Sequence, residues 1–559
     1  MECACTSRRL LIVLGLCMHA TAQVAPATTL PGDRASIYEP SQSWVYSALE
    51  TLAARGLLRT SFFTLRPWTR SRCAAMLLEA ESASRTRSDD AGIDATLAAL
   101  RREFSRELEG SSRPGRLEAL STRSTSIGGE PLNDGYHFAS TIVNDDGRPF
   151  ARGENSYTNV AASSTFSHFA AYARIELQST SSPTPQPSAA AQLQISAADF
   201  TPAAIQGPVT GFTRGRLPEA YLSFAIAGNT IAFGRQTLLW GPGRNGGSLF
   251  TNNADPVLML RYDREKPFVL PGVLRFLGPI RAQAFIGRLN GTQFVHTNHQ
   301  TFGSPGVSVP DQPFIHGEKV AFQPTPNWEF SVARTTLFAG QGAPFTTRTL
   351  LRSLFSTGTG EENADPGDRR VSFDTRYRVP GLQNVLTVYL DSFAEDEPFP
   401  LNYPKQSVWL PGLELHPFPH NSHWTLRIEG LLSPHRSNAF SGFFYFNVHY
   451  LSGYTNSRQL LGSWIGREAH GTQTWLTWHP SPRTFVEMSV RSQNVASDFL
   501  RGGTLRDLQW NFEKAVRPDL TLRLQEQVER WNFPLLSSTT HFNSSFTVQL
   551  TYRTSGGSR

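Results

Sequence analysis

The feature that most constrains the fold is an alternation of apolar and polar residues that begins near Leu117 and continues almost to the end of the chain. It is clearest in residues 168–178, 507–513, 520–528 and 546–553. A period of two places successive side chains on opposite faces of a β-strand. The 44 glycines and 37 prolines further oppose long helices. The sequence therefore predicts a mainly β protein whose strands have one apolar and one polar face.

Strands of this kind occur in soluble sandwiches and propellers as well as in membrane barrels. After the first 22 residues no stretch approaches the roughly 20 apolar residues of a membrane-spanning helix. Two features favour the barrel: the polar faces carry regularly spaced Arg, Glu and Gln, and nine of the eleven tryptophans lie between Trp240 and Trp531, many near strand ends. No fixed-period repeat supports a propeller. At about 24 residues per strand and connection, Leu117 to Arg553 would form a transmembrane antiparallel barrel of about 18 strands.

The amino terminus has the order of a secretory signal peptide. Arg8 and Arg9 precede an apolar run, and Ala20-Thr21-Ala22 precedes Gln23, so we expect residues 1–22 to be removed. Cys73 is the one cysteine outside this leader, which excludes an internal disulfide or a cysteine-based metal site in the exported chain. The net charge of +6 comes without a dense basic run, so nucleic acid is not an expected partner.

The segment between the leader and the alternating region has helical periodicity. Val45, Leu49 and Leu52 recur at helical spacing, Thr69 is placed to cap a second helix, and residues 93–108 carry a third apolar stripe. We therefore expect this domain order: residues 1–22 signal peptide, 23–40 extended arm, 41–110 helical segment acting as a periplasmic plug, a polar break at 111–115, 116–553 outer-membrane barrel, 554–559 tail.

A glycine-rich run, Gly241-Pro242-Gly243-Arg244-Asn245-Gly246, matches the bare spacing of a dinucleotide-binding loop. That function needs a helix directly after the glycines, whose amino end would face the pyrophosphate. No helical stripe follows here, and an exported chain lacks a ready nicotinamide supply. We expect no cofactor, and we interpret the glycines as permitting a tight loop or a close backbone approach to a ligand.

Two acid-rich segments raise the alternative of a carbohydrate-active enzyme, because glycoside hydrolysis uses a pair of carboxylates. The acids are Glu395, Asp396 and Glu397 after one strand, and Glu361, Glu362, Asp365 and Asp368 in a glycine-rich loop. Adjacent acids on a strand point to opposite faces, and neither a G-x-S-x-G nor an H-E-x-x-H motif is present. We assign no catalytic and no metal-binding residue.

Arginines recur on the polar faces of the expected strands. Those singled out are Arg174, Arg376, Arg427, Arg491 and Arg523, with Glu176, Glu429 and Glu487 as available partners. Ion pairs between neighbouring strands would brace a polar barrel interior, whereas unpaired guanidinium groups would form a cationic lumen that binds a ligand. We favour bracing.

Residues 233–256 read FGRQTLLWGPGRNGGSLFTNNADP, and this segment resembles the signature of the Wzi capsule assembly family. The residues that carry the resemblance are Gly234, Arg235, Gln236, Trp240, Gly241, Pro242, Gly243, Ser248, Leu249, Asn252, Asn253, Ala254 and Pro256. Residues 49–57 and 454–466 are similar to further family patterns, and the order of leader, helical segment and long barrel also matches.

The resemblance implies a monomeric outer-membrane barrel whose lumen is closed on the periplasmic side by helices. It also implies a lectin-like, non-catalytic anchor that retains capsular or extracellular polysaccharide at the cell surface, with membrane lipid around the wall. The sequence leaves open whether the signature residues determine the fold or lie close to the saccharide. A porin-type diffusion channel remains the alternative function, with an outer-membrane enzyme less favoured.

Overall fold

The structure is a computed structural model of the 559-residue chain. It describes residues 34–85, 91–110, 113–182, 186–202, 205–297, 300–355, 367–395, 403, 406–418, 423–433 and 441–554. The expected signal peptide, most of the arm and most of the tail lie outside these residues, as do Glu361, Glu362, Asp365, Asp396 and Glu397.

Eighteen antiparallel strands close into one barrel, which confirms the predicted fold. The strands are β2 (Arg113–Gly128), β5 (Gly153–Phe166), β6 (Phe169–Thr180), β7 (Phe212–Ile226), β8 (Asn229–Gln236), β10 (Val257–Arg264), β12 (Pro279–Arg288), β15 (Phe314–Thr325), β16 (Trp328–Phe338), β17 (Asp368–Arg378), β18 (Leu386–Glu395), β19 (Ser407–Leu415), β20 (Trp424–Leu432), β23 (Ala469–Ser481), β24 (Thr484–Val495), β25 (Gly503–Arg517), β26 (Leu520–Asn532) and β27 (His541–Arg553). The barrel closes where β2 pairs with β27, for example Arg123 with Gln549.

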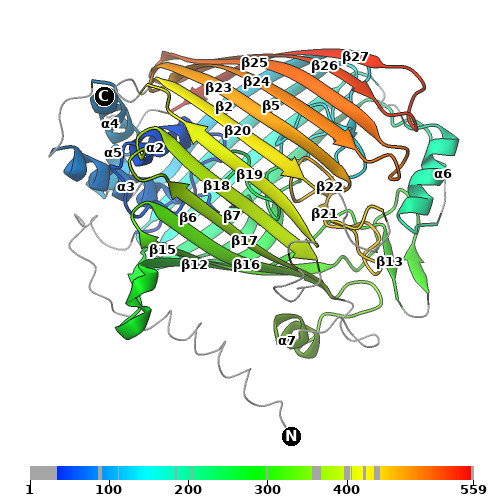
Figure 1. Cartoon of the computed structure of the whole chain (residues 1–559), viewed down its shortest axis with the longest axis horizontal. Helices are drawn as coiled ribbons and strands as arrows, with labels where there is room; N and C mark the ends of the chain where they lie inside the picture. The colour runs from blue at the N-terminus through cyan, green and yellow to red at the C-terminus, as the bar shows by residue number, and fades with distance from the viewer. Residues whose placement is uncertain are drawn as a thin grey trace, which may run out of the picture.

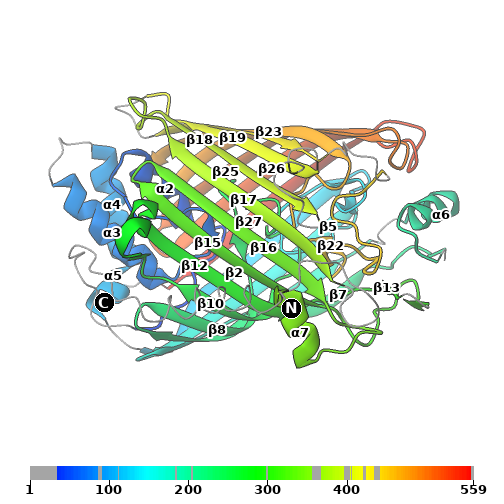
Figure 2. The same ribbon diagram turned by 60° about the horizontal axis from the view of Figure 1, so that its bottom comes forward.

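The two ends of the barrel differ. Short turns such as those between β5 and β6 and between β15 and β16 lie at one end, where the amino-terminal helices gather (Figures 1 and 2). Long connections lie at the other, including the one that carries α6 (Ala189–Ala198). We call the end with the amino-terminal helices the short-turn end, and the end with the long connections the long-loop end. The smaller elements are β1 (Leu65–Arg66), β3 (Asn133–Asp134), β4 (Ala139–Ser140), β9 (Leu239–Trp240), β11 (Phe268–Val269), η1 (Gly272–Leu277), β13 (Phe294–His296), β14 (Thr301–Gly303), α7 (Thr347–Phe355), β21 (Thr455–Asn456) and β22 (Gln459–Leu460).

The amino-terminal segment is helical, with one difference from the sequence prediction. Its helices are α2 (Trp44–Ala54), α3 (Arg70–Ser84), α4 (Ala91–Glu103) and α5 (Ser105–Glu109). The Thr69 hydroxyl caps α3 by accepting from the amide of Arg72. The predicted third helix is divided at Phe104, whose backbone leaves helical geometry while its ring is buried under the Arg70 guanidinium.

The polar break expected at residues 111–115 is wrong from Arg113 onward, because β2 already begins there. Arg113 pairs with Thr165, and the register shifts between Arg113 and Arg116. Such a bulge accommodates the proline and glycine that suggested a break.

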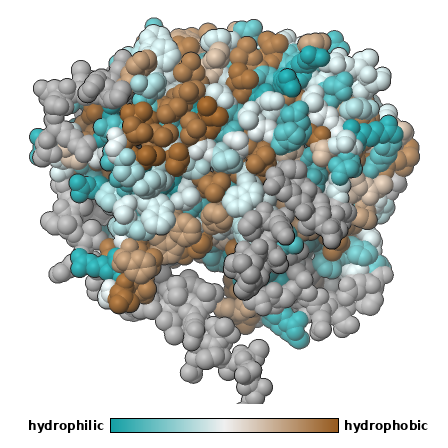
Figure 3. Space-filling model, viewed as in Figure 1, coloured by the Kyte–Doolittle hydropathy of each residue, from teal (hydrophilic) through white to brown (hydrophobic). Residues whose placement is uncertain are grey.

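The outer wall is apolar and the inner face polar. On β6, Phe169, Ile175 and Leu177 are exposed on the outside, as the alternation predicts. Figure 3 shows apolar side chains gathered over the wall on the viewed face. The expected aromatic girdle holds only in part: Trp328, Trp478 and Trp510 are exposed, whereas Trp240, Trp464, Trp475 and Trp531 are buried. None of the helices in the described ranges is long and apolar enough to cross a membrane.

Four of the five inward arginines brace the interior through carboxylates. Arg174 binds Asp146 and Glu219, Arg376 binds Glu414, Arg427 binds Glu414 and Glu50, Arg491 binds Asp507, and Arg523 donates to the amide oxygen of Asn511. Asp146 and Glu50 belong to an inward loop and to α2, so the bracing joins the wall to what fills the barrel. Two of the carboxylates expected as partners are also paired. Glu176 on β6 is bound by Arg148, which lies in the same inward loop as Asp146, and Glu487 is bound by Arg244.

Candidate functional site

The signature segment lies inside the barrel. After β8 the chain enters the lumen and forms the motif loop, which we define as residues 237–256. Its strand β9 pairs with β1 of the amino-terminal segment, with Leu65 opposite Trp240 and Arg66 opposite Leu239. Two parts of the chain some 175 residues apart therefore meet as a two-stranded sheet in the interior.

Trp240 is the centre of this contact. Its ring packs edge-on against Phe250 and Phe285, with centroids 5.4 and 5.6 Å away. Its indole N–H donates to the side-chain oxygen of Gln283 at 2.7 Å. Only 2 % of Trp240 is exposed, so its faces are already covered by protein and are not available to stack on a sugar.

Arg66 fastens the glycine-rich turn. Its guanidinium donates to the backbone oxygens of Gly241 at 3.2 Å and Gly243 at 2.5 Å. Gly241 has a φ of +119°, and an added Cβ would lie 2.6 Å from the Cα of Gly247. Only glycine fits this crossing of two backbone segments. No helix follows the turn within the motif loop, as the rejection of a dinucleotide site required.

The second family pattern packs on the first. In residues 454–466, the backbone oxygen of Leu461 accepts from the amide of Thr251, and that of Gly462 accepts from the side-chain amide of Asn253 at 2.7 Å. The Tyr445 hydroxyl joins them, donating to the oxygen of Ser248 and accepting from the amide of Ser463. The two segments that resemble family patterns thus form one interior core.

The other signature residues hold the ends of the motif loop. Gly234 in β8 has a φ of +138°, and Gln236 caps that strand by donating to the backbone oxygen of Met259 at 3.3 Å. Asn252 donates to the oxygen of Asn144, and Asn253 accepts from its amide. The rest lie close by: Arg235 is half-buried in β8, Pro242 is buried in the turn, and Pro256 is buried just before β10.

The acids that suggested an enzyme are not arranged for catalysis where the structure describes them. Asp368 and Glu395 both bind the guanidinium of Arg370, at 2.6 and 3.0 Å. Both are buried, and Glu395 also accepts from the backbone amide of Tyr445. These two carboxylates therefore tie β17 and β18 to the interior core.

A buried ionic cluster joins the connections at the long-loop end. His137, between β3 and β4, contacts Asp134 at 2.7 Å and Asp199 at 2.6 Å, and Arg467 contacts Asp199 at 2.5 Å. Burial alone would lower the pKa of His137, but the two carboxylates raise it from 6.5 to about 10. Burial would raise the pKa of Asp199, yet His137 and Arg467 hold it below 3.8. Asp199 is the C-cap of α6, so this cluster fastens that helix.

The cluster predicts a pH dependence for the order of α6. The raised pKa of His137 stabilises the contact fully below about pH 6.5, and this stabilisation decreases until it is lost above about pH 10. The lowered pKa of Asp199 adds a loss of stability as the pH falls below about 3.8. We expect amide exchange in α6, corrected for its intrinsic rate, to be slowest between about pH 4 and 6.5. His137→Gln should raise exchange at pH 6 by about tenfold, since charge-assisted hydrogen bonds are lost. His168→Gln is the control, because His168 lies at a short turn. Equal protection of the α6 amides in the His137→Gln and His168→Gln variants would contradict the role of the ionic cluster in fastening α6.

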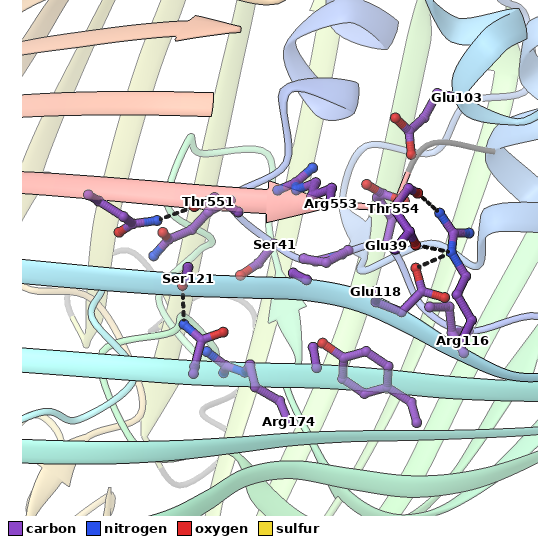
Figure 4. Close-up of a pocket in the computed structure, with 18 of the residues that line it drawn as sticks. Glu39, Ser41, Glu103, Arg116, Glu118, Ser121, Arg174, Thr551, Arg553 and Thr554 are labelled. Atoms are coloured by element: carbon purple, nitrogen blue, oxygen red, sulfur yellow. Dashed lines mark hydrogen bonds and ion pairs between the residues drawn. The ribbon is translucent and has the colours of Figure 1, made fainter. Parts of the chain in front are cut away.

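A cavity opens at the short-turn end of the barrel. A chamber of about 660 Å³ lies between the amino-terminal segment and the wall formed by β2, β5, β6 and β27. Figure 4 shows side chains of these strands lining it around Ser41. A second cavity of about 270 Å³ follows the inner face of β23 to β27 and shares Ser41, Gln42, Arg123 and Gln549 with the first. Among the lining residues, the sequence singled out Asn252 of the signature and the inward arginines Arg174, Arg427, Arg491 and Arg523. The cavities themselves were not predicted, because the strand pattern shows which residues point inward but not which of them remain uncovered.

The fold and its interior define a class: an outer-membrane type β-barrel whose lumen is filled by its own loops and by an amino-terminal segment. The chain belongs to the capsule assembly protein Wzi family, whose model matches residues 122–545. This agrees with the resemblance of the signature segment. A search of curated proteins finds no match.

Solved structures support the fold. The chain is similar to Wzi of Escherichia coli, described as an outer-membrane protein involved in group 1 capsule assembly and as a carbohydrate-binding β-barrel. The identity is 13 %, the match covers 94 % of this chain and 100 % of that one, and the TM-score is 0.65. OccD3 of Pseudomonas aeruginosa and OccAB1 of Acinetobacter baumannii match at 8 and 9 % identity over 79 % of this chain, covering 93 and 98 % of theirs, with TM-scores of 0.42 and 0.43.

Proposed function

We propose that the protein is a lectin-like anchor in the outer membrane that retains capsular or extracellular polysaccharide at the cell surface. The observation that carries this proposal is membership of the capsule assembly family over residues 122–545. The carbohydrate binding described for the similar Escherichia coli barrel supports it. The apolar outer wall is suited to lipid, and the short-turn end, with the amino-terminal helices, faces the periplasm.

In this arrangement the polysaccharide is held at the long-loop end. The signature residues serve the interior core, since Trp240 and Gly241 are buried. Their effect on binding is therefore indirect: they hold the lumenal ends of the loops whose outer surfaces meet the polymer.

The protein binds polymer without cleaving it. The buried Asp368 and Glu395 are committed to Arg370, which argues against their use as an acid and nucleophile pair. A diffusion channel is disfavoured by the filled lumen, in which β1 and β9 pair in the interior and residues 454–466 pack on the motif loop near Thr251 and Asn253.

Cells that lack the protein should continue to synthesise polymer but release most of it into the medium. The purified protein should bind isolated polymer, with each sugar contact weak. Because many repeats on one chain meet one or several proteins, we expect the polymer to bind at least about a hundredfold more tightly than a single-repeat oligosaccharide. Biolayer interferometry with immobilised protein measures the affinity for the polymer and the affinity for the oligosaccharide.

Two results would contradict the proposal. Polymer that stays on the surface of cells lacking the protein would remove the anchoring role. Shortened oligosaccharides after incubation of polymer with purified protein would indicate an enzyme. A heat-denatured sample of the same protein controls for contaminating hydrolases and for non-specific adsorption.

A further inference from the structure

The 660 Å³ chamber at the short-turn end has a surplus of positive charge. Nine arginines and six carboxylates line it. The arginines are Arg70, Arg102, Arg116, Arg123, Arg148, Arg174, Arg483, Arg517 and Arg553. Six of them make ion pairs, for example Arg70 with Glu39 at 2.8 Å. Within the described part of the chain, Arg102, Arg483 and Arg553 have no carboxylate within ion-pairing distance.

These three arginines come from separate elements at the mouth of the chamber. Arg102 lies on α4, Arg483 in the turn between β23 and β24, and Arg553 at the end of β27. Burial lowers the pKa of Arg483, Glu103 opposes this effect, and the positive charge of Arg553 lowers it further. Positive groups that repel one another inside a polar cavity favour the binding of an anion between them.

A side pocket next to the chamber contains a second, independent feature. This pocket of about 70 Å³ is lined by Trp44 of α2 and by polar and charged side chains of the wall. These are three arginines, Arg483, Arg523 and Arg553, one carboxylate, Glu513, and Thr521, Gln549 and Thr551, with Gln42 at its edge. Trp44 is 8 % exposed, and its indole N–H has no hydrogen-bond partner among the described residues. The Arg483 guanidinium lies 6.0 Å from the centre of the Trp44 ring. A buried donor without an acceptor costs stability unless a ligand or water supplies one.

The rest of the chamber offers groups that suit sugar hydroxyls. Ser121 accepts from the side-chain amide of Asn159 at 2.5 Å, and Gln549 donates to the Thr551 hydroxyl at 3.0 Å. Tyr172 adds an aromatic face to the wall. The lining thus places hydroxyl and amide groups beside the arginines, with apolar side chains such as Ile37, Ala161 and Val516 between them.

We propose that this periplasmic chamber binds an acidic saccharide, with Arg483 and Arg553 meeting its carboxylate and the Trp44 N–H donating to it. The inference rests on the proposed function, because it takes polysaccharide as the ligand class. It places a second saccharide site at the opposite end of the barrel from the anchoring loops. The remainder of the sugar chain lies along Ser121, Asn159 and Gln549.

The test compares an acidic and a neutral probe on the full-length protein in detergent. Trigalacturonate should bind in calorimetry, and maltotriose, a neutral trimer of similar size, should bind at least tenfold more weakly. Arg483→Gln together with Arg553→Gln should weaken trigalacturonate at least tenfold, since two charge-assisted contacts are lost. Trp44→Phe, which keeps a ring but removes the N–H, should weaken it less.

Arg506→Gln is the matched control, because Arg506 is exposed on β25 and does not line the chamber. Unchanged trigalacturonate affinity in the double variant, with its folding verified by the heat-dependent gel shift, would overturn the proposal. Inorganic phosphate that binds as tightly as trigalacturonate would also overturn it, because the site would then hold free oxyanions and not saccharides.

The same variants separate this site from surface anchoring. Cells carrying the double arginine variant should still retain polymer, since the long-loop end is unchanged. Failure of the proposed function would appear as retained polymer in cells that lack the whole protein. Failure of this inference would appear as unaltered trigalacturonate binding in the purified double variant.

Discussion

Trp240→Ala should destabilise the barrel by about 3–5 kcal/mol and abolish polymer binding together with the fold. The substitution removes a ring that is 2 % exposed and packed between Phe250 and Phe285. It also leaves the side-chain oxygen of Gln283 without its donor. The heat-dependent shift in gel mobility and urea unfolding in detergent measure the loss.

Two variants sharpen this experiment. Trp240→Phe keeps an aromatic ring but loses the hydrogen bond to Gln283, and should cost about 1–3 kcal/mol. Trp510→Ala, on the outer wall where the ring is 48 % exposed, should change stability less than either. A Trp240→Ala protein with normal stability that has lost polymer binding would instead make Trp240 a sugar contact.

Deletion of residues 41–110 should convert a closed barrel into a conducting one. The segment supplies β1, which pairs with β9, and Arg66, which holds the carbonyl groups of Gly241 and Gly243. Without it the helices are gone and the tip of the motif loop has lost its anchor. An 18-stranded barrel without its filling contains an aqueous channel. Planar-bilayer recordings should therefore change from a flat baseline to discrete conductance steps.

A single substitution tests the same mechanism with less disruption. Arg66→Ala should give brief openings, because the motif loop is loosened while the helices remain. Arg101→Ala is the matched control, since Arg101 pairs with Glu81 on the outside of the helices and its side chain is 58 % exposed. A deletion variant that still shows the gel shift but remains closed would indicate that the loops fill the lumen by themselves.

Much of the fold was predictable from local pattern. The alternation at residues 168–178 predicts the outward row of Phe169, Ile175 and Leu177, because a strand with one face in lipid must be apolar on that face. Helix caps such as Thr69 are equally local. The strand number followed from the length of the alternating region. The position of Trp240 was not predictable, since a tryptophan near a strand end is equally suited to an interfacial girdle and to a buried core.

The sequence by itself determined the barrel, its apolar exterior and the family, since each depends on the order of residues along one strand or one motif. Only the tertiary structure decided that the signature segment is an interior core, because Arg66, Gln283 and Gly462 reach it from distant parts of the chain. The same applies to the chamber. Which arginines pair with a carboxylate depends on loops such as residues 141–152, whose Asp145 and Asp146 bind Arg148 and Arg174. Arg483, which donates to the backbone oxygen of Pro518, and Arg553 form no ion pair among the described residues, and no local pattern in the sequence distinguishes them from the paired arginines.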